Sequence, residues 1–327
     1  MSKQQKQSPD TDVRFRTSIG GQALMEGILM RGPQKQAIVC RTPDGLVEKI
    51  DELHMVKDKH PILGWPLIRG VVTFVDSMVK GMQALTYSAD LLPLEEQGEP
   101  DKLDQWIEKH FSEEKAKDII IGVAVVLGIA LSVVLFILLP TLLAGLTDSF
   151  IHSPVVRNLV EGLLRIVIFL LYLWGVTRMP DVARMFSYHG AEHKTIFCYE
   201  KGLPLTVENV RPQSRFHPRC GTSFLFVVVI ISILVFSLVS LKVALWDNVW
   251  VRVGLRLLLL PLVVSISYEI NRWVGRHDNL CSRILSAPGK WLQHITTFEP
   301  DDDMIECAIR AMELVIPEEK GSDLWGE

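Results

Sequence analysis

Two histidines four residues apart carry the clearest chemical signal in this sequence. His189 and His193 lie in the segment YHGAEHK, residues 188–194. In a helix, beginning near Pro180, this spacing puts both imidazoles on one face, where they can reach a single metal ion. Gly190 lowers helix propensity by about 1 kcal/mol relative to alanine, so the geometry depends on the surrounding fold.

A carboxylate stands beside the second histidine. Glu192 completes the order H-x-x-E-H, which inverzincin peptidases use for a metal ion and a general base. It can act as the catalytic base on a water molecule, as a ligand, or as a hydrogen-bond partner of a ligand. These roles stay open at the level of the sequence.

A second cluster follows in the same stretch of chain. His217 and Cys220 are three residues apart in HPRCGTS, residues 217–223, and both side chains bind zinc or similar ions. Two histidines with a third ligand from His217, Cys220 or Glu200 leave one position for water, which is the usual form of a catalytic zinc site. Four protein ligands would make a structural site instead. The expected cofactor is a divalent metal ion such as zinc.

A plainer reading competes with the metal site. The chain has nine histidines, and pairs at this spacing also arise by chance. The imidazoles would then bond to backbone carbonyls or to lipid phosphates at a membrane surface. Further polar residues are candidates for the same site or for structural ion pairs: Glu26, Arg31, Lys194, Glu200, Arg219 and Glu269.

Four apolar segments flank these motifs, and each is long enough to cross a bilayer core as a helix of about 20 residues. Two of them contain no charged side chain, whereas the other two include Glu161, Arg165 and Arg256. Glu161 and Arg165 are four residues apart and can pair, which lowers their cost in lipid. The segments are residues 119–147, 159–177, 221–241 and 253–270.

Lysine and arginine are concentrated before the first apolar segment, in the connection 178–220, and after the last apolar segment. Basic segments stay on the cytoplasmic side of a membrane, so four spans with both termini in the cytoplasm place all three there. The polar start of the chain shows no cleavable signal peptide. Because the cysteines then face the cytoplasm, we expect thiols or ligands and no disulfides.

The remaining sequence predicts elements around the spans. A Thr-Pro-Asp-Gly turn between residues 34–41 and 46–50 indicates a β-hairpin in a small N-terminal β unit. Residues 66–92 predict an amphipathic helix that lies at the interface, packs on the spans or inserts, and residues 301–316 predict a soluble helix. The predicted fold is mainly α, a polytopic four-helix membrane protein with cytoplasmic helices. Its expected divisions are a disordered tail 1–17, a cytoplasmic hairpin and amphipathic-helix region 18–117, a membrane region 118–270 with the site in loop 178–220, and a cytoplasmic helical region 271–327.

Composition excludes several classes of protein. With 48% hydrophobic and 22% charged residues, the chain is too apolar to be disordered, and five scattered cysteines do not make a disulfide-rich module. A net charge of −4 gives no support for nucleic acid as a partner. The expected partner is membrane lipid, and a membrane-protein partner or a second copy of the chain stays open.

Several motifs together resemble the YqhQ-like family of bacterial membrane proteins. They are GGQALMEGILMR at 20–31, YHGAEHKTI at 188–196, HPRCGTSFL at 217–225, SYE at 267–269 and QHITTFEP at 293–300. The family is described as predicted metal-dependent enzymes of unknown function. The resemblance therefore implies a multi-pass protein of the bacterial inner membrane with a suspected metal site, and it implies no substrate.

Two functions of different classes remain. The first is a metal-dependent hydrolase at the cytoplasmic face of the membrane, with His189 and His193 holding the ion, His217 or Cys220 as the third ligand, and Glu192 as the base. The alternative is a non-catalytic membrane biogenesis or scaffold protein, in which the same cluster holds a structural metal or docks a partner. A transporter is disfavoured, because the spans contain few polar side chains.

Overall fold

The computed structural model describes residues 13–53, 61–92, 113–147, 149–242, 248–277, 279–319 and 321–325. The chain divides into two compact units. The first comprises Met1–Leu92, Leu173–Val228 and Val264–Glu327, and the second comprises Pro93–Tyr172 and Val229–Val263. The divisions expected from the sequence are linear, whereas each of these units draws on separate stretches of chain.

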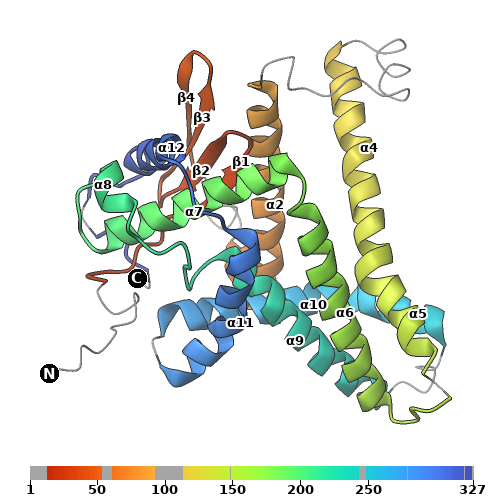
Figure 1. Ribbon diagram of the computed structural model, residues 1–327. Helices are drawn as coiled ribbons and strands as arrows, with labels where there is room; N and C mark the ends of the chain where they lie inside the picture. Colours follow the sequence, from red (N-terminus) through yellow and green to blue (C-terminus); the bar gives the residue numbers. More distant parts are fainter. Residues whose placement is uncertain are drawn as a thin grey trace, which may run out of the picture. The chain divides into compact units, whose positions relative to one another are not determined.

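A four-stranded antiparallel sheet forms part of the first unit (Figure 1). The β3–β4 hairpin turns at Pro43 and Asp44, as the Thr-Pro-Asp-Gly motif predicts, which confirms the small β unit. The β1–β2 hairpin adds two strands that the sequence did not indicate. Its turn places Glu26 at a φ of 48°, a conformation that glycine or asparagine usually adopts. The strands follow one another in space as in sequence: β1 Gly20–Leu24, β2 Gly27–Arg31, β3 Lys35–Thr42 and β4 Gly45–Glu52.

The two faces of the sheet bury alternate side chains. Ile28 belongs to the core that the sheet shares with helices α7 (Pro180–Glu200) and α12 (Asp302–Glu313). The next residue, Leu29, belongs to a second core on the other face, which is covered by helix α2 (Ile68–Asp90). This period of two is that of extended strands. The sheet therefore lies between α2 and the pair α7 and α12.

The sequence suggested two of these helices in part. Helix α7 begins at Pro180, where a helix was suggested within the expected loop 178–220, and α12 lies within the soluble helix expected at residues 301–316. Asp301 caps α12 by accepting a hydrogen bond from the backbone N–H of Met304 at 2.9 Å. The first unit also contains the short helices η2 (Pro61–Gly64) and α8 (Val207–Val210) and the longer α11 (Leu280–Thr296).

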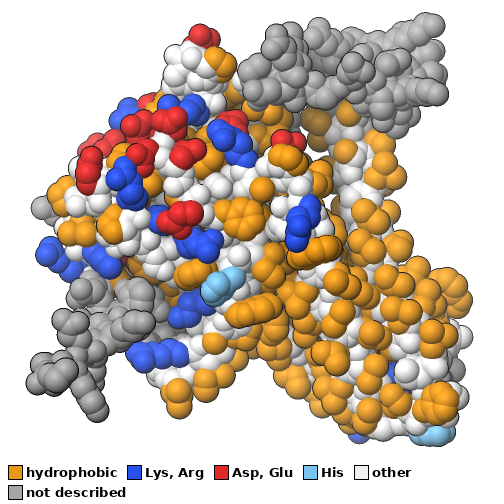
Figure 2. Space-filling view, in the orientation of Figure 1, with side chains coloured by type: hydrophobic (Ala, Val, Ile, Leu, Met, Phe, Trp, Pro, Cys, Tyr) orange, Lys and Arg blue, Asp and Glu red, His pale blue; other side chains and the backbone are white. Residues whose placement is uncertain are grey.

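Among the residues that the structure describes, three helices are long and apolar enough to cross a membrane, and a fourth apolar helix is shorter. All four apolar segments predicted from the sequence are therefore helical, and the mainly α fold is confirmed. Figure 2 shows hydrophobic side chains over most of the visible face of α5, α6 and α9. The three long helices are Ile119–Gly145, which joins α4 (Glu113–Val133), the π-helical η3 (Val134–Leu138) and α5 (Leu139–Gly145), then α6 (Pro154–Val176) and α10 (Val249–Arg276); the fourth is α9 (Gly221–Ser240).

Charged side chains of the second unit bind one another inside these apolar helices. Glu161 is 2% exposed, and its Oε1 accepts hydrogen bonds from Arg165 at 3.1 Å and from Thr141 at 3.0 Å. A guanidinium nitrogen of Arg256 lies 2.5 Å from the same oxygen. The expected pair of Glu161 with Arg165 is confirmed, and Arg256 makes it a cluster.

Three expectations for the flanking regions have different outcomes. Residues 1–12 of the expected disordered tail lie outside the described residues, but Thr17 pairs with Leu324 in a β-bridge, and its backbone N–H donates to Glu200 at 2.9 Å. Part of the expected region 18–117, at residues 54–60 and 93–112, lies outside the described part of the chain. Helix α2 packs on the sheet, which the sequence did not predict, and its Arg69 pairs with Glu269 of α10, which favours packing over insertion.

Candidate metal centre

Helix α7 brings the two histidines together. His189 and His193 are one helical turn apart, and their ring centroids are separated by 4.4 Å. Gly190, between them, allows a close approach of another segment, because a Cβ there would lie 2.0 Å from the backbone oxygen of Phe298. The glycine that weakened the helical prediction therefore allows the segment carrying Thr296 and Phe298 to lie directly against α7.

Backbone carbonyls fix the orientation of both imidazoles. Nδ1 of His189 lies 2.8 Å from the carbonyl oxygen of Thr296, and Nδ1 of His193 lies 2.6 Å from that of Arg215. A carbonyl can only accept, so each ring carries a proton on Nδ1, and Nε2 is the nitrogen that can bind a metal ion once it carries no proton. A carbonyl or carboxylate on the second ring nitrogen is the usual arrangement of histidines that bind metal ions.

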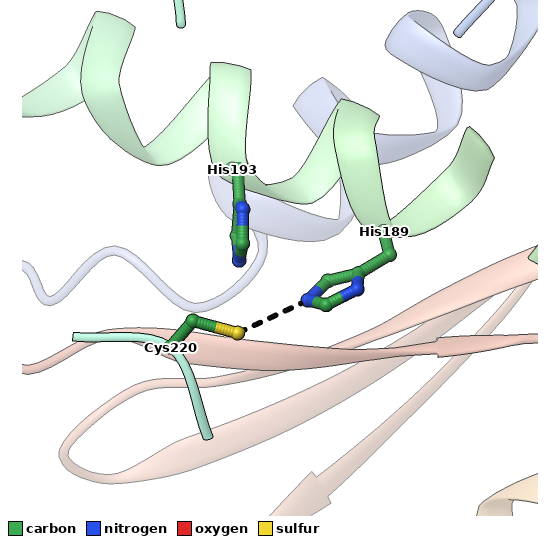
Figure 3. Close-up of side chains that lie close together, drawn as sticks. All are labelled: His189, His193 and Cys220. Carbon is green, nitrogen blue, oxygen red and sulfur yellow. Dashed lines mark hydrogen bonds between the residues drawn. The ribbon is translucent and has the colours of Figure 1, made fainter. Parts of the chain in front are cut away.

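Cys220 supplies a third donor atom (Figure 3). Its Sγ lies 3.3 Å from Nε2 of His189, and both His193 and His189 point toward it from the same face of α7. The ligand atoms of His189, His193 and Cys220 all lie within 4.8 Å of one another. Nitrogen and sulfur donors at this separation can close on one ion, since zinc takes about 2.0–2.1 Å to nitrogen and about 2.3 Å to sulfur. The three side chains could therefore hold a metal ion.

Glu192 lies next to this cluster and is held by the sheet. Its Oε1 accepts a hydrogen bond from the backbone N–H of Gly21 in β1 at 2.9 Å. The carboxylate is buried, and Oε2 has no hydrogen-bond partner in the described part of the chain. A Cβ at Gly21 would lie 3.0 Å from Cδ of Glu192, so glycine is what lets β1 come this close. One carboxylate oxygen is thus anchored, and the other is available to a ligand.

The charges of the cluster influence one another. Burial raises the pKa of Cys220, but the neighbouring His189 and His193 outweigh it and hold the pKa of the thiol well below its ordinary value. Burial lowers the pKa of His189, and the interaction with Cys220 reverses this and raises the pKa to about 9. Burial raises the pKa of Glu192. The pocket therefore favours a thiolate facing positive charge, which is the ligand form of cysteine.

His217 lies beside the three donors without joining them. Its ring centroid is 5.6 Å from that of His193, and its Nε2 lies 3.6 Å from Glu200. Burial lowers the pKa of His217 to about 4, so the ring is neutral. Gln293 holds its backbone with two hydrogen bonds, from the N–H of His217 at 2.7 Å and to its carbonyl at 2.8 Å. As a metal ligand, His217 stays a prediction.

The other candidate residues are engaged in ion pairs and hydrogen bonds around the site. Glu200 pairs with Arg219, and Lys194 donates to the carbonyl of Arg211 at 2.8 Å and pairs with Glu299. The remaining contacts are those of Glu26 with Arg184 and with the hydroxyl of Tyr188 at 3.2 Å, of Arg31 with Ser77 at 3.4 Å, and of Glu269 with Arg69 at 2.7 Å.

A cavity of about 420 Å³ opens onto the cluster within the first unit. His189, Glu192, His193 and Cys220 line it, and so do Arg219 and the first four residues of β1. Apolar side chains complete the lining: Leu85, Met185, Phe186, Ile196 and Trp325. The donor atoms are therefore accessible to a small molecule or to part of a larger one.

Sequence reasoning missed the groups that orient the ligands. Gly21, Arg215, Gln293 and Thr296 act through backbone atoms or an amide, and no ligand pattern marks such groups. Gly21 and Gln293 do lie in motifs that carry the family resemblance, GGQALMEGILMR and QHITTFEP, and that was the available signal. The expected absence of disulfides agrees with the cysteines, none of which is bridged: Cys40, Cys198, Cys220, Cys281 and Cys307.

Comparisons with known proteins agree with the resemblance noted above. A family model described as "Protein of unknown function (DUF1385)" matches residues 65–318. The chain is 33% identical over 299 residues to "Uncharacterized protein YqhQ" of Bacillus subtilis (strain 168), and the match covers 89% of this chain and 90% of that protein. No solved structure matches.

Proposed function

Because the chain belongs to the DUF1385 family of proteins of unknown function, and YqhQ, to which it is similar, is uncharacterised, we propose its function from the geometry of its own site. The proposal is a metal-dependent hydrolase, with a divalent ion such as zinc held by His189, His193 and Cys220. Glu192 is the general base. The site faces the cytoplasm at the inner membrane of a bacterium.

One observation carries the proposal. Two imidazoles have their Nδ1 atoms bonded to carbonyls and their Nε2 atoms directed, with Sγ of Cys220, at a common point within 4.8 Å. A pair of core histidines that merely satisfied their own hydrogen bonds would not need a thiol at the same point. Three protein donors beside a cavity leave a position for water, as in catalytic rather than structural zinc sites.

The residues divide the chemistry among them. A divalent ion at this point would act as a Lewis acid and lower the pKa of a water molecule to about 7. Glu192 is placed to accept the proton of that water, since Oε1 is anchored by Gly21 and Oε2 has no partner among the described residues. Apolar side chains form part of the cavity wall, and a bound substrate that displaced water from it would strengthen the electrostatic interactions there.

The membrane topology is part of the proposal. Crossing by four apolar helices, with both termini inside, keeps the basic segments and the metal centre on the cytoplasmic side. A membrane-impermeant maleimide applied to intact cells should then leave Cys281, which is exposed in the fold, unlabelled until the membrane is opened. Labelling of Cys281 from outside would refute this topology.

The metal content of the purified protein tests the function most simply. We expect close to one zinc ion per wild-type chain, and almost none in H189A or H193A. H152A is the matched control, because His152 is exposed and remote in sequence from the site, and it should keep the metal. Wild-type protein without stoichiometric metal would rule out the proposal.

Glu192→Gln separates catalysis from a structural role. Glutamine keeps the acceptor for Gly21 but cannot take a proton, so the variant should retain metal and thermal stability. It should fail to restore the wild-type phenotype to a strain that lacks its own copy. Full restoration would favour the alternative, a non-catalytic scaffold with a structural metal.

A further inference from the structure

The two edges of the sheet differ in how they meet their surroundings. The order β1-β2-β3-β4 leaves β1 and β4 each with one edge that no other strand of the sheet covers. Strand β4, GLVEKIDE, carries four charged residues, which is a common way to prevent another strand from pairing. Strand β1, GGQAL, carries none, and its two glycines leave the backbone accessible.

The hydrogen-bond pattern shows which backbone groups of β1 point outward. In antiparallel pairs, alternate residues direct their N–H and C=O away from the partner strand. The N–H of Gly21 donates to Glu192 at 2.9 Å, and that of Met25 donates to Ser88 at 3.3 Å. Both therefore point away from β2, and Ala23 between them does the same. Among the described residues the N–H of Ala23 has no hydrogen-bond partner.

Four of the five residues of β1 line the same cavity as the metal-binding residues. Gly20, Gly21, Gln22 and Ala23 all border it, together with His189, Glu192, His193 and Cys220. The hydrogen bond from Gly21 to Glu192 fixes how far β1 lies from the carboxylate of the proposed site. Because a strand advances about 3.3 Å per residue, a chain bonded at Ala23 reaches the carboxylate within one or two residues.

We propose that this edge recognises an extended peptide segment, which pairs with β1 through Ala23 and so presents a peptide bond to Glu192 and the metal centre. The inference rests on the proposed function for cleavage, but binding of the peptide needs only the edge and the cavity. Pairing with an exposed strand is a general mode of peptide recognition, in which backbone bonds supply affinity and alternate side chains supply specificity.

The cavity favours apolar side chains next to the recognised bond. Leu85 of α2 and Met185 and Phe186 of α7 stand on its walls, and Arg219 is paired with Glu200. A lipid-linked substrate would fill such walls equally well, but an acyl chain has no donors or acceptors for the outward groups of β1. The outward backbone groups are therefore the observation that selects a peptide.

Ala23→Pro tests the edge directly. Proline removes the outward N–H, and because that group does not bond to β2, the sheet keeps its ladder. Ala23→Ser keeps the N–H and serves as the matched control. Random dodecapeptides displayed on phage would be selected on the full-length wild-type chain in lipid nanodiscs. Fluorescein-labelled synthetic copies of the selected peptides would then be titrated against each variant.

We expect apolar peptides that bind A23S like the wild type and bind A23P about fivefold to tenfold more weakly, which is the loss of one backbone hydrogen bond. N-methylation of single peptide amides keeps the test valid if A23P folds poorly, because it changes only the peptide. Methylation of every second peptide amide, those that would face β1, should weaken binding. Methylation of the amides between them should not.

Three results would overturn the inference: no selected peptide, equal affinity for A23P and A23S, or insensitivity to N-methylation. The outcome is independent of the metal. Peptides that bind through Ala23 to a protein without metal would leave the edge assignment standing and refute the hydrolase. If the protein contains metal but its edge binds no peptide, the hydrolase proposal would stand and the edge assignment would be refuted.

Discussion

The cluster around Glu161 in the second unit and the cluster around His189 in the first unit both bury charged or titratable side chains, but with different chemistry. Glu161 accepts from Arg165 and Thr141 and lies 2.5 Å from Arg256. His189 and His193 instead direct their Nδ1 atoms at backbone carbonyls, which leaves Nε2 as the atom that could bind a metal ion. Guanidinium groups have hydrogen-bond donors and no acceptor. In the first cluster, the arginines therefore cannot act as ligands of a metal ion, and the carboxylate of Glu161 is already bound by them.

Burial of charge alone therefore does not mark a functional site in this protein. In the apolar helices the arginines neutralise a carboxylate, which makes its presence among hydrophobic side chains tolerable. In the proposed metal centre, two imidazole nitrogens and a sulfur lie close together beside a cavity. The arrangement of these atoms is what distinguishes the proposed ligand site from the structural cluster, and each prediction below tests that distinction.

The largest expected effect is on stability, from Glu161→Ala. Removing the carboxylate leaves Arg165 and Arg256 close together without their counter-charge, and breaking a buried pair costs about 3–5 kcal/mol. Thermal unfolding of the purified protein should show a large drop, while zinc per folded chain stays at the wild-type level. E313A, at an exposed position of α12, should change neither quantity. If E161A unfolded at the wild-type temperature, the structural role of the cluster would be wrong.

Gly190→Ala should have the next largest effect. A Cβ there would lie 2.0 Å from the oxygen of Phe298, so the segment that includes Thr296 must move away from His189. We expect a loss of about 1–3 kcal/mol, typical of overpacking, together with weaker zinc binding. Gly122→Ala in α4 is the control, because a Cβ there meets no atom within 4 Å. G190A with unchanged stability and zinc affinity would show that the contact has no importance.

Gln293→Ala should affect the metal more than the fold. The amide holds the backbone of His217 on both sides, and Cys220 follows three residues later. Loss of a group that supports a ligand typically lowers metal affinity about 10–100-fold, which competition with a chromogenic chelator can measure. Gln213→Ala removes another buried glutamine, bonded to the carbonyl of Asn209, and should leave affinity unchanged. Equal affinities for both variants would contradict the role of Gln293.

The smallest effect concerns the cysteines and leaves the fold intact. Burial raises the pKa of both Cys40 and Cys307 to about 12, so almost no thiolate exists at pH 8 and neither should react with iodoacetamide. Exposed Cys281 should react at once. Bound zinc should protect Cys220, and a chelator should expose it, as mass spectrometry of the labelled peptides would show. Alkylation of Cys220 at the same rate with and without zinc would remove sulfur from the ligand set.

The local features of the fold could be predicted from the sequence. The length of the apolar runs indicated the four apolar helices, and the spacing of apolar residues indicated α2 and α12. Pro180 suggested the start of α7, and the Thr-Pro-Asp-Gly turn located the β3–β4 hairpin. The β1–β2 hairpin escaped prediction because its turn has no glycine and depends on Glu26 at a positive φ. That conformation is supported by tertiary contacts, since Glu26 pairs with Arg184 of α7.

The proposed metal centre could be predicted only in part, for a similar reason. Residue types and a spacing of four suggested His189 and His193, and a spacing of three from His217 placed Cys220 among the candidates. Choosing between Cys220 and His217 requires knowing that Gln293 holds the backbone of His217 and that the ring faces Glu200. The contact of Glu192 with Gly21 joins residues far apart in sequence, and no local pattern encodes it.

X-ray absorption at the zinc edge tests the central claim most directly. For the purified wild-type chain, the account predicts one sulfur at about 2.3 Å and two imidazole nitrogens at about 2.0–2.1 Å, with a fourth light atom from water. C220S should lose the sulfur shell, and E192Q should keep the whole spectrum. A zinc environment without sulfur, or protein that retains no zinc at all, would contradict the assignment of His189, His193 and Cys220 as a metal centre.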